Sequence, residues 1–177
     1  IYDQTGRYAV GFTGRSIHPQ CQNCKRWHSG SCPQINTEGW TRSSKWFNHN
    51  FRKESSLFNW WHAEEAIKAD NMVVLVESQT TALRLVQAGV YCVLGRYGVE
   101  LSDEQQVLLE RCPAMNLVDL SDNDEAGQRA REDIKQRLRR CFKLHFPTFS
   151  TNDIGDMSVE QVQDEILPVL QQIAIRG

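Results

Sequence analysis

Short apolar runs alternate with amphipathic segments from about residue 72 onward, and this alternation limits the fold more than any other feature. Met72 to Glu77 is rich in β-branched and apolar residues, as expected for a buried strand. Ser78 to Ala88 then has helical periodicity and ends at Gly89. A strand followed by a helix, repeated along a chain, is typical of a parallel sheet covered by helices. We therefore expect an α/β fold.

The pattern predicts three further units of the same kind. Ser102 and Gln105 form a capping box, which begins a helix that runs to about Cys112. Pro168 should kink or break the last helix, because proline removes a donor and crowds the preceding turn. The further expected strands are 90–94, 116–120 and 142–146, and the further expected helices are 102–112, 125–140 and one that a second capping box begins at Ser158 and Gln161.

Acidic residues follow three of the expected strands. Glu77 ends the first strand, Asp122 and Asp124 follow the third, and Asp153 and Asp156 follow the fourth. The carboxyl ends of parallel strands meet at one edge of the sheet, so these carboxylates should gather there. Crowded carboxylates repel one another unless a cation lies among them, and Mg²⁺ prefers oxygen ligands and bridges to phosphate. The pattern predicts a magnesium site for phosphodiester or nucleotidyl chemistry, although Asp-x-Asp-x-x-Gly alone is as typical of a capped turn.

The charge of the chain is unevenly distributed. Residues 1–68 carry nine Lys or Arg against five Asp or Glu, whereas residues 69–177 carry eleven against seventeen. A basic half suits phosphate backbones and an acidic half suits divalent cations. The distribution is compatible with an enzyme that holds nucleic acid and metal, and chance clustering of charge is the alternative.

Four soft ligands lie close together in a polar segment that interrupts the basic half. Cys21, Cys24, His28 and Cys32 follow the spacing C-x2-C-x3-H-x3-C. In a reducing cytosol such spacing favours zinc over disulfides, and a segment this short would need a metal to fold. His18 could replace His28 as the fourth ligand, and free surface thiols are the alternative. The three remaining cysteines are expected in the core: Cys92, Cys112 and Cys141.

Two other groups are interpreted as ordinary structure. The aromatic residues before the first α/β unit are expected to pack in the core rather than stack on bases. The basic residues of the helix 125–140 are expected on a solvated face. The aromatic group is Phe47, Phe51, Phe58, Trp60 and Trp61, and the basic group is Arg129, Arg131, Lys135, Arg137, Arg139 and Arg140.

The sequence offers neither an apolar stretch long enough to cross a bilayer nor a basic-then-apolar signal segment. We therefore expect a cytoplasmic protein without a membrane partner. The chain begins at Ile1 without an obvious domain start, which suggests a fragment of a larger protein.

The order of the acidic motifs resembles that of the TOPRIM domain of primases, topoisomerases and related nucleases. The resemblance covers about residues 70–165 and depends on Val74-Leu75-Val76-Glu77 and on Asp122-Asn123-Asp124-Glu125-Ala126-Gly127. It implies a Rossmann-like parallel sheet flanked by helices. It also implies that Glu77 is a general acid, a base or a metal ligand and that Asp122 and Asp124 bind Mg²⁺. Two residues depart from the family pattern, Ser78 in place of Gly and Asn152 in place of Lys.

The sequence before residue 70 resembles the catalytic core of DnaG-type bacterial and bacteriophage primases. Gly6 to Arg15 is similar to a strand and glycine-rich turn of that core, and the likeness resumes from Lys45 to Asn59. It implies that Arg15, Lys45 and Lys53 contact the template and the incoming nucleotide. The expected domains are a small basic subdomain, 1–69, with a zinc-binding insertion at 16–44, and the TOPRIM domain, 70–177.

The function that this resemblance implies is synthesis of RNA primers on single-stranded DNA from ribonucleoside triphosphates, with Mg²⁺ or Mn²⁺. It also implies that the protein acts in a bacterial cell or a phage-infected host. A replicative helicase would be a partner only through regions outside this sequence. Two alternatives remain at this point. One is TOPRIM nuclease or topoisomerase chemistry, although no Gly-x-x-x-x-Gly-Lys loop is present. The other is a non-catalytic module that binds single-stranded nucleic acid.

Overall fold

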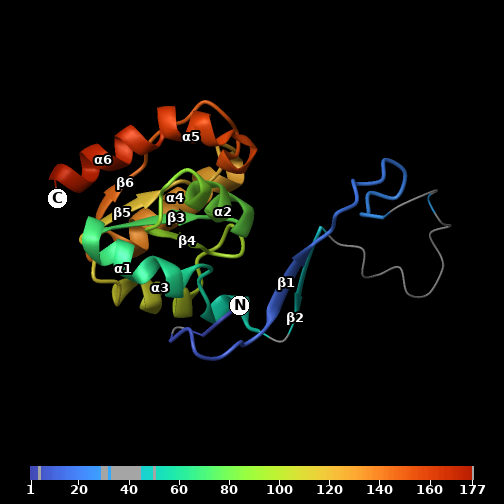
Figure 1. Cartoon of the computed structure of the whole chain (residues 1–177), viewed down its shortest axis with the longest axis horizontal. Coiled ribbons are helices and arrows are strands. Elements are labelled where there is room, and N and C mark those ends of the chain that lie inside the picture. Colours follow the sequence, from blue (N-terminus) through green and yellow to red (C-terminus); the bar gives the residue numbers. More distant parts are fainter. Residues whose placement is uncertain (4, 29–31, 33–44, 50, 177) are drawn as a thin grey trace. The chain divides into compact units, whose positions relative to one another are not determined.

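The structure is a computed structural model, and it describes residues 1–3, 5–28, 32, 45–49 and 51–176. The chain divides into two compact units, residues 1–51 and residues 52–177. The second unit contains a parallel sheet with helices on both of its faces, as Figure 1 shows. The domain division that the sequence predicts between residues 69 and 70 stays a prediction.

The sheet of the second unit has four strands in the order β4-β3-β5-β6, and every neighbouring pair is parallel. Its central strand β3 is buried along its whole length, because all five of its residues are apolar. Burying each such side chain contributes about 1.5–3 kcal/mol. The strands are β3 (Met72–Val76), β4 (Val93–Gly95), β5 (Asn116–Asp119) and β6 (Lys143–His145). The predicted parallel sheet is confirmed.

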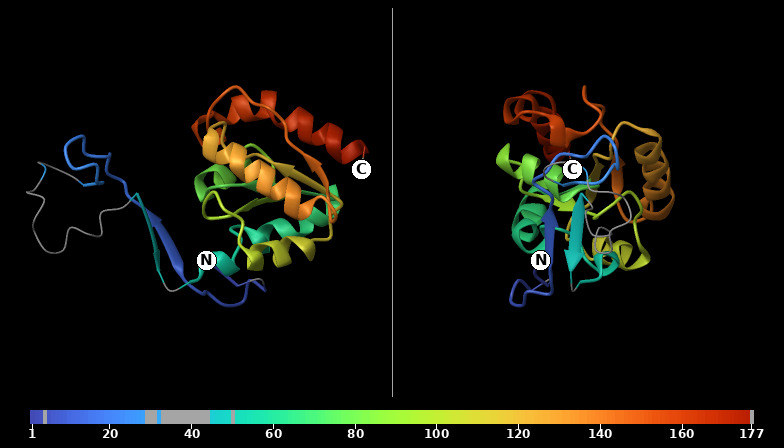
Figure 2. Two further views of the ribbon diagram at one scale, coloured as in Figure 1. Left: turned by 180° about the vertical axis from the view of Figure 1, so that it is seen from behind. Right: turned by 90° about the vertical axis from the view of Figure 1, so that its right-hand side faces the viewer.

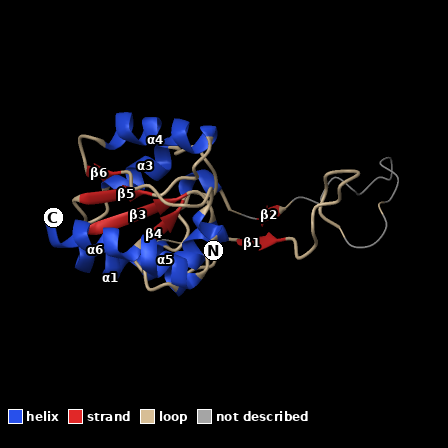
Figure 3. Cartoon of the chain, turned by 90° about the horizontal axis from the view of Figure 1, so that it is seen from above, coloured by secondary structure: helices blue, strands red, loops and turns tan. Residues whose placement is uncertain are grey.

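Helices cover the sheet on both sides, with α3 and α4 on one side and α5 and α6 on the other (Figure 3). Figure 2 shows α4 lying across one face of the sheet. The helices are α1 (Trp60–Asp70), α2 (Gln79–Gln87), α3 (Asp103–Glu110), α4 (Glu125–Leu138), α5 (Val159–Glu165) and α6 (Leu167–Arg176), with short 3-10 helices η2 (Lys53–Ser55) and η3 (Ile154–Asp156).

The local signals for helix ends are confirmed. Both predicted capping boxes form, at Ser102 before α3 and at Ser158 before α5. Gly89 has a positive φ of 97° just after α2, which glycine adopts without strain. The last helix breaks as expected, into α5 and α6, and Pro168 becomes the second residue of α6. Proline is tolerated there because the N–H groups of a first helical turn have no intrahelical partner.

The first unit contains a two-stranded antiparallel sheet of β1 (Phe12–Arg15) and β2 (Trp46–His49). Phe12 pairs with His49 and Arg15 pairs with Trp46. The strand expected within residues 6–15 is therefore present, in the second half of that segment. The predicted insertion, residues 16–44, is described only at 16–28 and at 32, and the rest of it lies outside the described residues.

The predicted burial in the core was wrong for three side chains. Cys141 is exposed, because it follows the last turn of α4 rather than lying on its buried face. Phe47 and Trp61 are 43% and 49% exposed. Phe58 and Trp60 do pack against the core, as expected. Among the described residues, no helix is both long and apolar enough to cross a bilayer.

Candidate active site

The order of the strands creates a topological switch point beside β3. The chain leaves β3 toward β4 on one side, and it leaves β5 toward β6 on the other. Adjacent strands whose connections diverge in this way form a topological switch point, and ligands of open α/β sheets bind at the carboxyl ends of such strands. Glu77 directly follows β3, and Asp122 and Asp124 lie in the loop after β5. The acids expected to be catalytic therefore follow the two strands of this switch point.

Glu77 contacts the neighbouring loop directly. Its Oε1 accepts a hydrogen bond from the backbone N–H of Asp122 at 3.3 Å. Burial raises the pKa of Glu77, while the Arg96 guanidinium and this N–H act in the opposite direction. A carboxylate with a raised pKa is a better proton acceptor, and it keeps a second oxygen for another partner.

Asp122 and Asp124 have different local roles. Asp124 caps α4, because its Oδ1 accepts from the N–H of Gly127 at 2.7 Å. Gly127 allows the helix to approach the loop, since a Cβ at this position would collide with the backbone carbonyl of Asp122. Asp122 makes no such cap and lies among acids. Burial and, to a smaller extent, the charges of Asp153, Glu77 and Asp124 together raise its pKa to about 7.

Asp153 joins this group from the loop that precedes η3. Its Oδ1 accepts from the N–H of Gly155 at 2.6 Å and from the hydroxyl of Thr81 at 3.0 Å. Thr81 lies in the first turn of α2, so this bond connects α2 to the loop before η3. Asp156 ends η3, and its N–H donates to the carbonyl of Asp153 at 3.1 Å.

The acids are neighbours without forming a closed cage. Among the described residues, no three of these carboxylates place their oxygens within 4.8 Å of one another. Mg²⁺ does not require such a cage, because it keeps several waters and binds through one or two carboxylates plus substrate phosphates. The donor set contains only oxygen, and the pKa of Asp122 is raised by burial and then by three neighbouring carboxylates, whose repulsion a cation would offset. These residues therefore fit Mg²⁺ or Mn²⁺.

A buried ion network lies beneath the acidic loop, and the sequence interpretation missed it. Arg96 and Asp119 have side chains without solvent exposure and lie 3.9 Å apart, and Arg131 lies 3.8 Å from the other oxygen of Asp119. Burial raises the pKa of Asp119, and the two guanidiniums act in the opposite direction. A charged residue inside the apolar strand Asn116–Asp119 was the signal available in the sequence.

The same network corrects the interpretation of helix α4. Arg131 is only 19% exposed and donates to the carbonyl of Ser121, and Arg137, 22% exposed, donates to Gln106 at 2.7 Å. These two residues do not belong to a solvated face, because α4 turns them toward the sheet and toward α3. Arg129 matches the expectation, since its side chain is 72% exposed.

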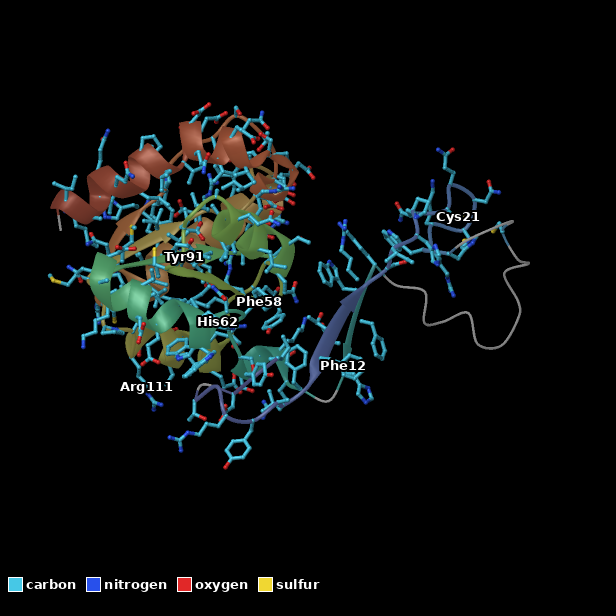
Figure 4. The ribbon with its side chains drawn as sticks, in the orientation of Figure 1. Phe12, Cys21, Phe58, His62, Tyr91 and Arg111 are labelled. Carbon is cyan, nitrogen blue, oxygen red and sulfur yellow. The ribbon has the colours of Figure 1, made fainter. Side chains whose placement is uncertain are left out.

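The four soft ligands of the first unit converge. The ligand atoms of Cys21, Cys24, His28 and Cys32 all lie within 4.8 Å of one another, and His18 is not in the group. Cys24 Sγ lies 3.3 Å from His28 Nε2. Tetrahedral Zn²⁺ with Zn–S bonds of about 2.3 Å places its ligands roughly 3.8 Å apart, so the arrangement suits zinc. Cys21 lies in the loop that follows β1 (Figure 4).

The backbone of this loop stabilises a thiolate. N–H groups of Cys24 and Asn23 lower the pKa of Cys21 to about 6, whereas burial and the neighbouring sulfurs raise the pKa of Cys32 to about 11. The turn is closed by a bond from Lys25 N–H to the carbonyl of Cys21 at 2.9 Å. A thiolate held by backbone N–H groups is the form of cysteine that binds metal.

The three cations expected to contact substrate are distributed over both units. Arg15 lies in β1, with its guanidinium carbon 6.0 Å from the ring centre of Trp46, and Lys45 immediately precedes β2. Lys53 lies in η2 of the second unit. There it lines a pocket of about 330 Å³ together with the segment 96–102, which follows β4.

The pKa of Asp122 predicts how the stability of the metal-free protein depends on pH. Its value rises from 3.8 to about 7 on folding, so the folded state binds more protons than the unfolded state between these pH values. Stability should therefore decrease as pH rises from about 4 to 7. Thermal unfolding in magnesium-free buffer checks this. Asp122→Asn should flatten the slope and Mg²⁺ should reverse the loss, whereas identical slopes for variant and wild type would contradict the prediction.

Comparisons with known proteins agree with this geometry. A family model described as Toprim-like matches residues 74–157. The DNA primase of Chlamydia pneumoniae is 29% identical over 130 residues, which are 73% of this chain and 19% of that protein. The chain thus spans about a fifth of this relative.

Solved structures give the same fold. The zinc-binding and RNA polymerase domains of the Aquifex aeolicus primase superpose with a TM-score of 0.67 at 23% identity, over 99% of this chain and 38% of that chain. A DnaG primase catalytic domain bound to single-stranded DNA superposes with a TM-score of 0.65 at 19% identity, over 99% and 49% of the two chains. The family model, the primase relative and these structures together identify the TOPRIM core of a DnaG-type DNA primase in this chain.

Proposed function

We propose that this chain is the catalytic core of an enzyme that joins ribonucleotides into primers on single-stranded DNA. The observation that carries the proposal is the position of Glu77, Asp122 and Asp124 at the switch point between β3 and β5. The similar catalytic domain bound to single-stranded DNA supports the choice of template. In this proposal residues 70–177 supply the chemistry, and residues 1–69 hold template and nucleotide.

The residues at the switch point divide the chemical work. Asp122 and Asp124, with Asp153 or Asp156, would hold Mg²⁺, which when bound neutralises the triphosphate and the departing pyrophosphate. Glu77 would hold metal or accept the proton of the attacking 3′-hydroxyl, and its raised pKa supports the second role. Arg15, Lys45 and Lys53 would bind phosphates of the template and of the incoming nucleotide. Positioning and charge stabilisation then account for most of the rate.

A primer-synthesis assay tests the proposal. The protein is incubated with a single-stranded DNA template, labelled ribonucleoside triphosphates and Mg²⁺ or Mn²⁺, and the products are separated by length. Template-dependent RNA oligomers are expected. Cleavage of the DNA without synthesis would replace this function by that of a TOPRIM nuclease. Binding of DNA with neither reaction, and with no metal bound at Asp122 and Asp124, would favour a non-catalytic module.

A structural zinc ion in the first unit completes the proposal. The site has four protein ligands and no open position, which is typical of a structural rather than a catalytic zinc. We expect about one Zn²⁺ per chain by elemental analysis, and we expect Cys24→Ser to lose it. Co²⁺ loaded in its place should show a thiolate-to-metal charge-transfer band in the near-ultraviolet.

His18 and His28 provide a matched pair for this test, because the structure places only one of them in the cluster. His28→Ala should weaken metal binding, while His18→Ala should leave the metal content and the Co²⁺ spectrum unchanged. Zinc-free protein whose Cys21, Cys24 and Cys32 react freely with an alkylating reagent would rule the site out.

A further inference from the structure

The segment from the end of β5 to α4 contains two kinds of polar residue. Asp119, the last residue of β5, and Ser121 have no solvent exposure, and the amide of the half-buried Asn123 donates to the carbonyls of Phe149 and Thr151 at 3.1 and 2.7 Å. Asp119, Ser121 and Asn123, the interior set, are therefore held by contacts within the protein. Asp122 and Asp124 are the acids of the candidate metal site.

Two arginines hold the residues of the interior set. Arg96 donates to the hydroxyl of Ser121 at 2.7 Å, and that hydroxyl donates to Asp119 at 2.9 Å. Arg131 donates from one nitrogen to the carbonyl of Ser121 at 2.6 Å and to the side-chain oxygen of Asn123 at 3.1 Å. Together they contact each member of the set.

The contacts of Arg131 flank the acid between them. It binds the residue before Asp122 and the residue after it, and its side chain crosses from α4 to the sheet. The backbone N–H of Asn123 in turn donates to the carbonyl of Asn152 at 2.8 Å, next to Asp153. The arginine therefore connects to both loops that carry acids of the site.

We propose that Arg131, supported by Arg96, is a positioning residue that fixes the backbone on both sides of Asp122 and thereby aligns the carboxylates for metal. This inference rests on the proposed function, because it assumes that the carboxylates bind a divalent cation. Hydrogen-bonded groups behind metal ligands set ligand orientation, and their removal usually weakens metal binding by about 10- to 100-fold.

The direction in which metal affinity changes when Arg131 is removed distinguishes a positioning role from a purely electrostatic one. Arg131 is a cation close to a cation site, so its removal should strengthen metal binding if charge alone mattered. If Arg131 positions the loop, its removal should weaken binding instead. Arg129 is the matched control, since it lies on the same helix, has a side chain that is 72% exposed and pairs with Glu125 rather than with a residue of the loop.

The experiment measures the affinity of zinc-loaded protein for Mn²⁺ by the electron paramagnetic resonance signal of the free ion. Mn²⁺ prefers oxygen ligands, so it reports on the carboxylates rather than on the cysteine cluster. We expect Arg131→Ala to bind Mn²⁺ roughly 10- to 100-fold more weakly than wild type. Arg131→Lys, which can make one of the two contacts, should recover part of the loss, and Arg129→Ala should bind like wild type.

Circular dichroism of each variant shows whether the fold is retained. If Arg131→Ala unfolds, Arg131→Lys and Arg131→Gln provide the comparison, because both keep most of the buried volume. Unchanged or tighter Mn²⁺ binding in folded Arg131 variants would overturn the positioning role while leaving the proposed function intact. Failure of wild type to bind Mn²⁺ would overturn the metal site itself and, with it, both proposals.

Discussion

Replacement of Asp122 by Asn is expected to reduce primer synthesis by roughly 10²- to 10³-fold, the range found when one group that stabilises transition-state charge is removed. Asp122 lies at the centre of the acidic group, because the charges of Asp153, Glu77 and Asp124 all act on it. Asn keeps the shape and one oxygen of the side chain but loses the negative charge that holds a cation. The primer-synthesis assay at saturating Mg²⁺ measures the loss.

The same substitution should stabilise the metal-free protein. The substitution removes a buried negative charge and its repulsion with the neighbouring carboxylates, which are the two causes of the raised pKa of Asp122. Above pH 7, Asp122→Asn should therefore melt at a higher temperature than wild type while it loses activity, which separates a site effect from unfolding. Glu132→Gln is the control, since this acid is 67% exposed on α4 and pairs with Lys135. Equal loss of activity in both variants would contradict a specific role for Asp122.

The strands and helix ends of the second unit could be predicted because each depends on a local pattern. A run such as Met72–Val76 is apolar throughout, and a capping box such as Ser102 with Gln105 acts over three residues. The order of the strands depends instead on pairing between distant segments. The sequence therefore predicted that acids follow strands, while the structure shows that β3 and β5 are adjacent with diverging connections.

The parts of the site that were missed are those formed by long-range contacts. Arg96 and Asp119 are 23 residues apart, and neither has a neighbour in sequence that indicates its partner. The choice between His18 and His28 is similar, because spacing allows either and only the turn at Cys21 brings His28 to the thiols. Arg131 shows the same limit on a helix, because it lies only two positions after the exposed Arg129 and yet pairs with the fully buried Asp119.

Gly127 connects the fold and the site. Its substitution by Ala should destabilise the protein, although the same substitution in a helix usually stabilises. Ala favours a helix interior over Gly by about 1 kcal/mol, so propensity alone predicts stabilisation. At Gly127, however, the new Cβ would collide with the backbone carbonyl of Asp122. Backbone moves aside only at a higher energetic cost than the end of a flexible side chain. We therefore expect the free energy of unfolding to fall by about 1–3 kcal/mol, as for other overpacked sites.

The collision should also displace Asp122, because the carbonyl that must move belongs to that residue. Gly127→Ala is therefore expected to lose most primer synthesis even where chemical denaturation shows that the protein is folded. Gly14→Ala is the matched control, since a Cβ at Gly14 in β1 would meet nothing within 4 Å. It should change the free energy of unfolding by less than about 0.5 kcal/mol. Stabilisation by Gly127→Ala would mean that α4 does not need close approach to the loop, and the alignment of Asp122 would then have to come from the arginines alone.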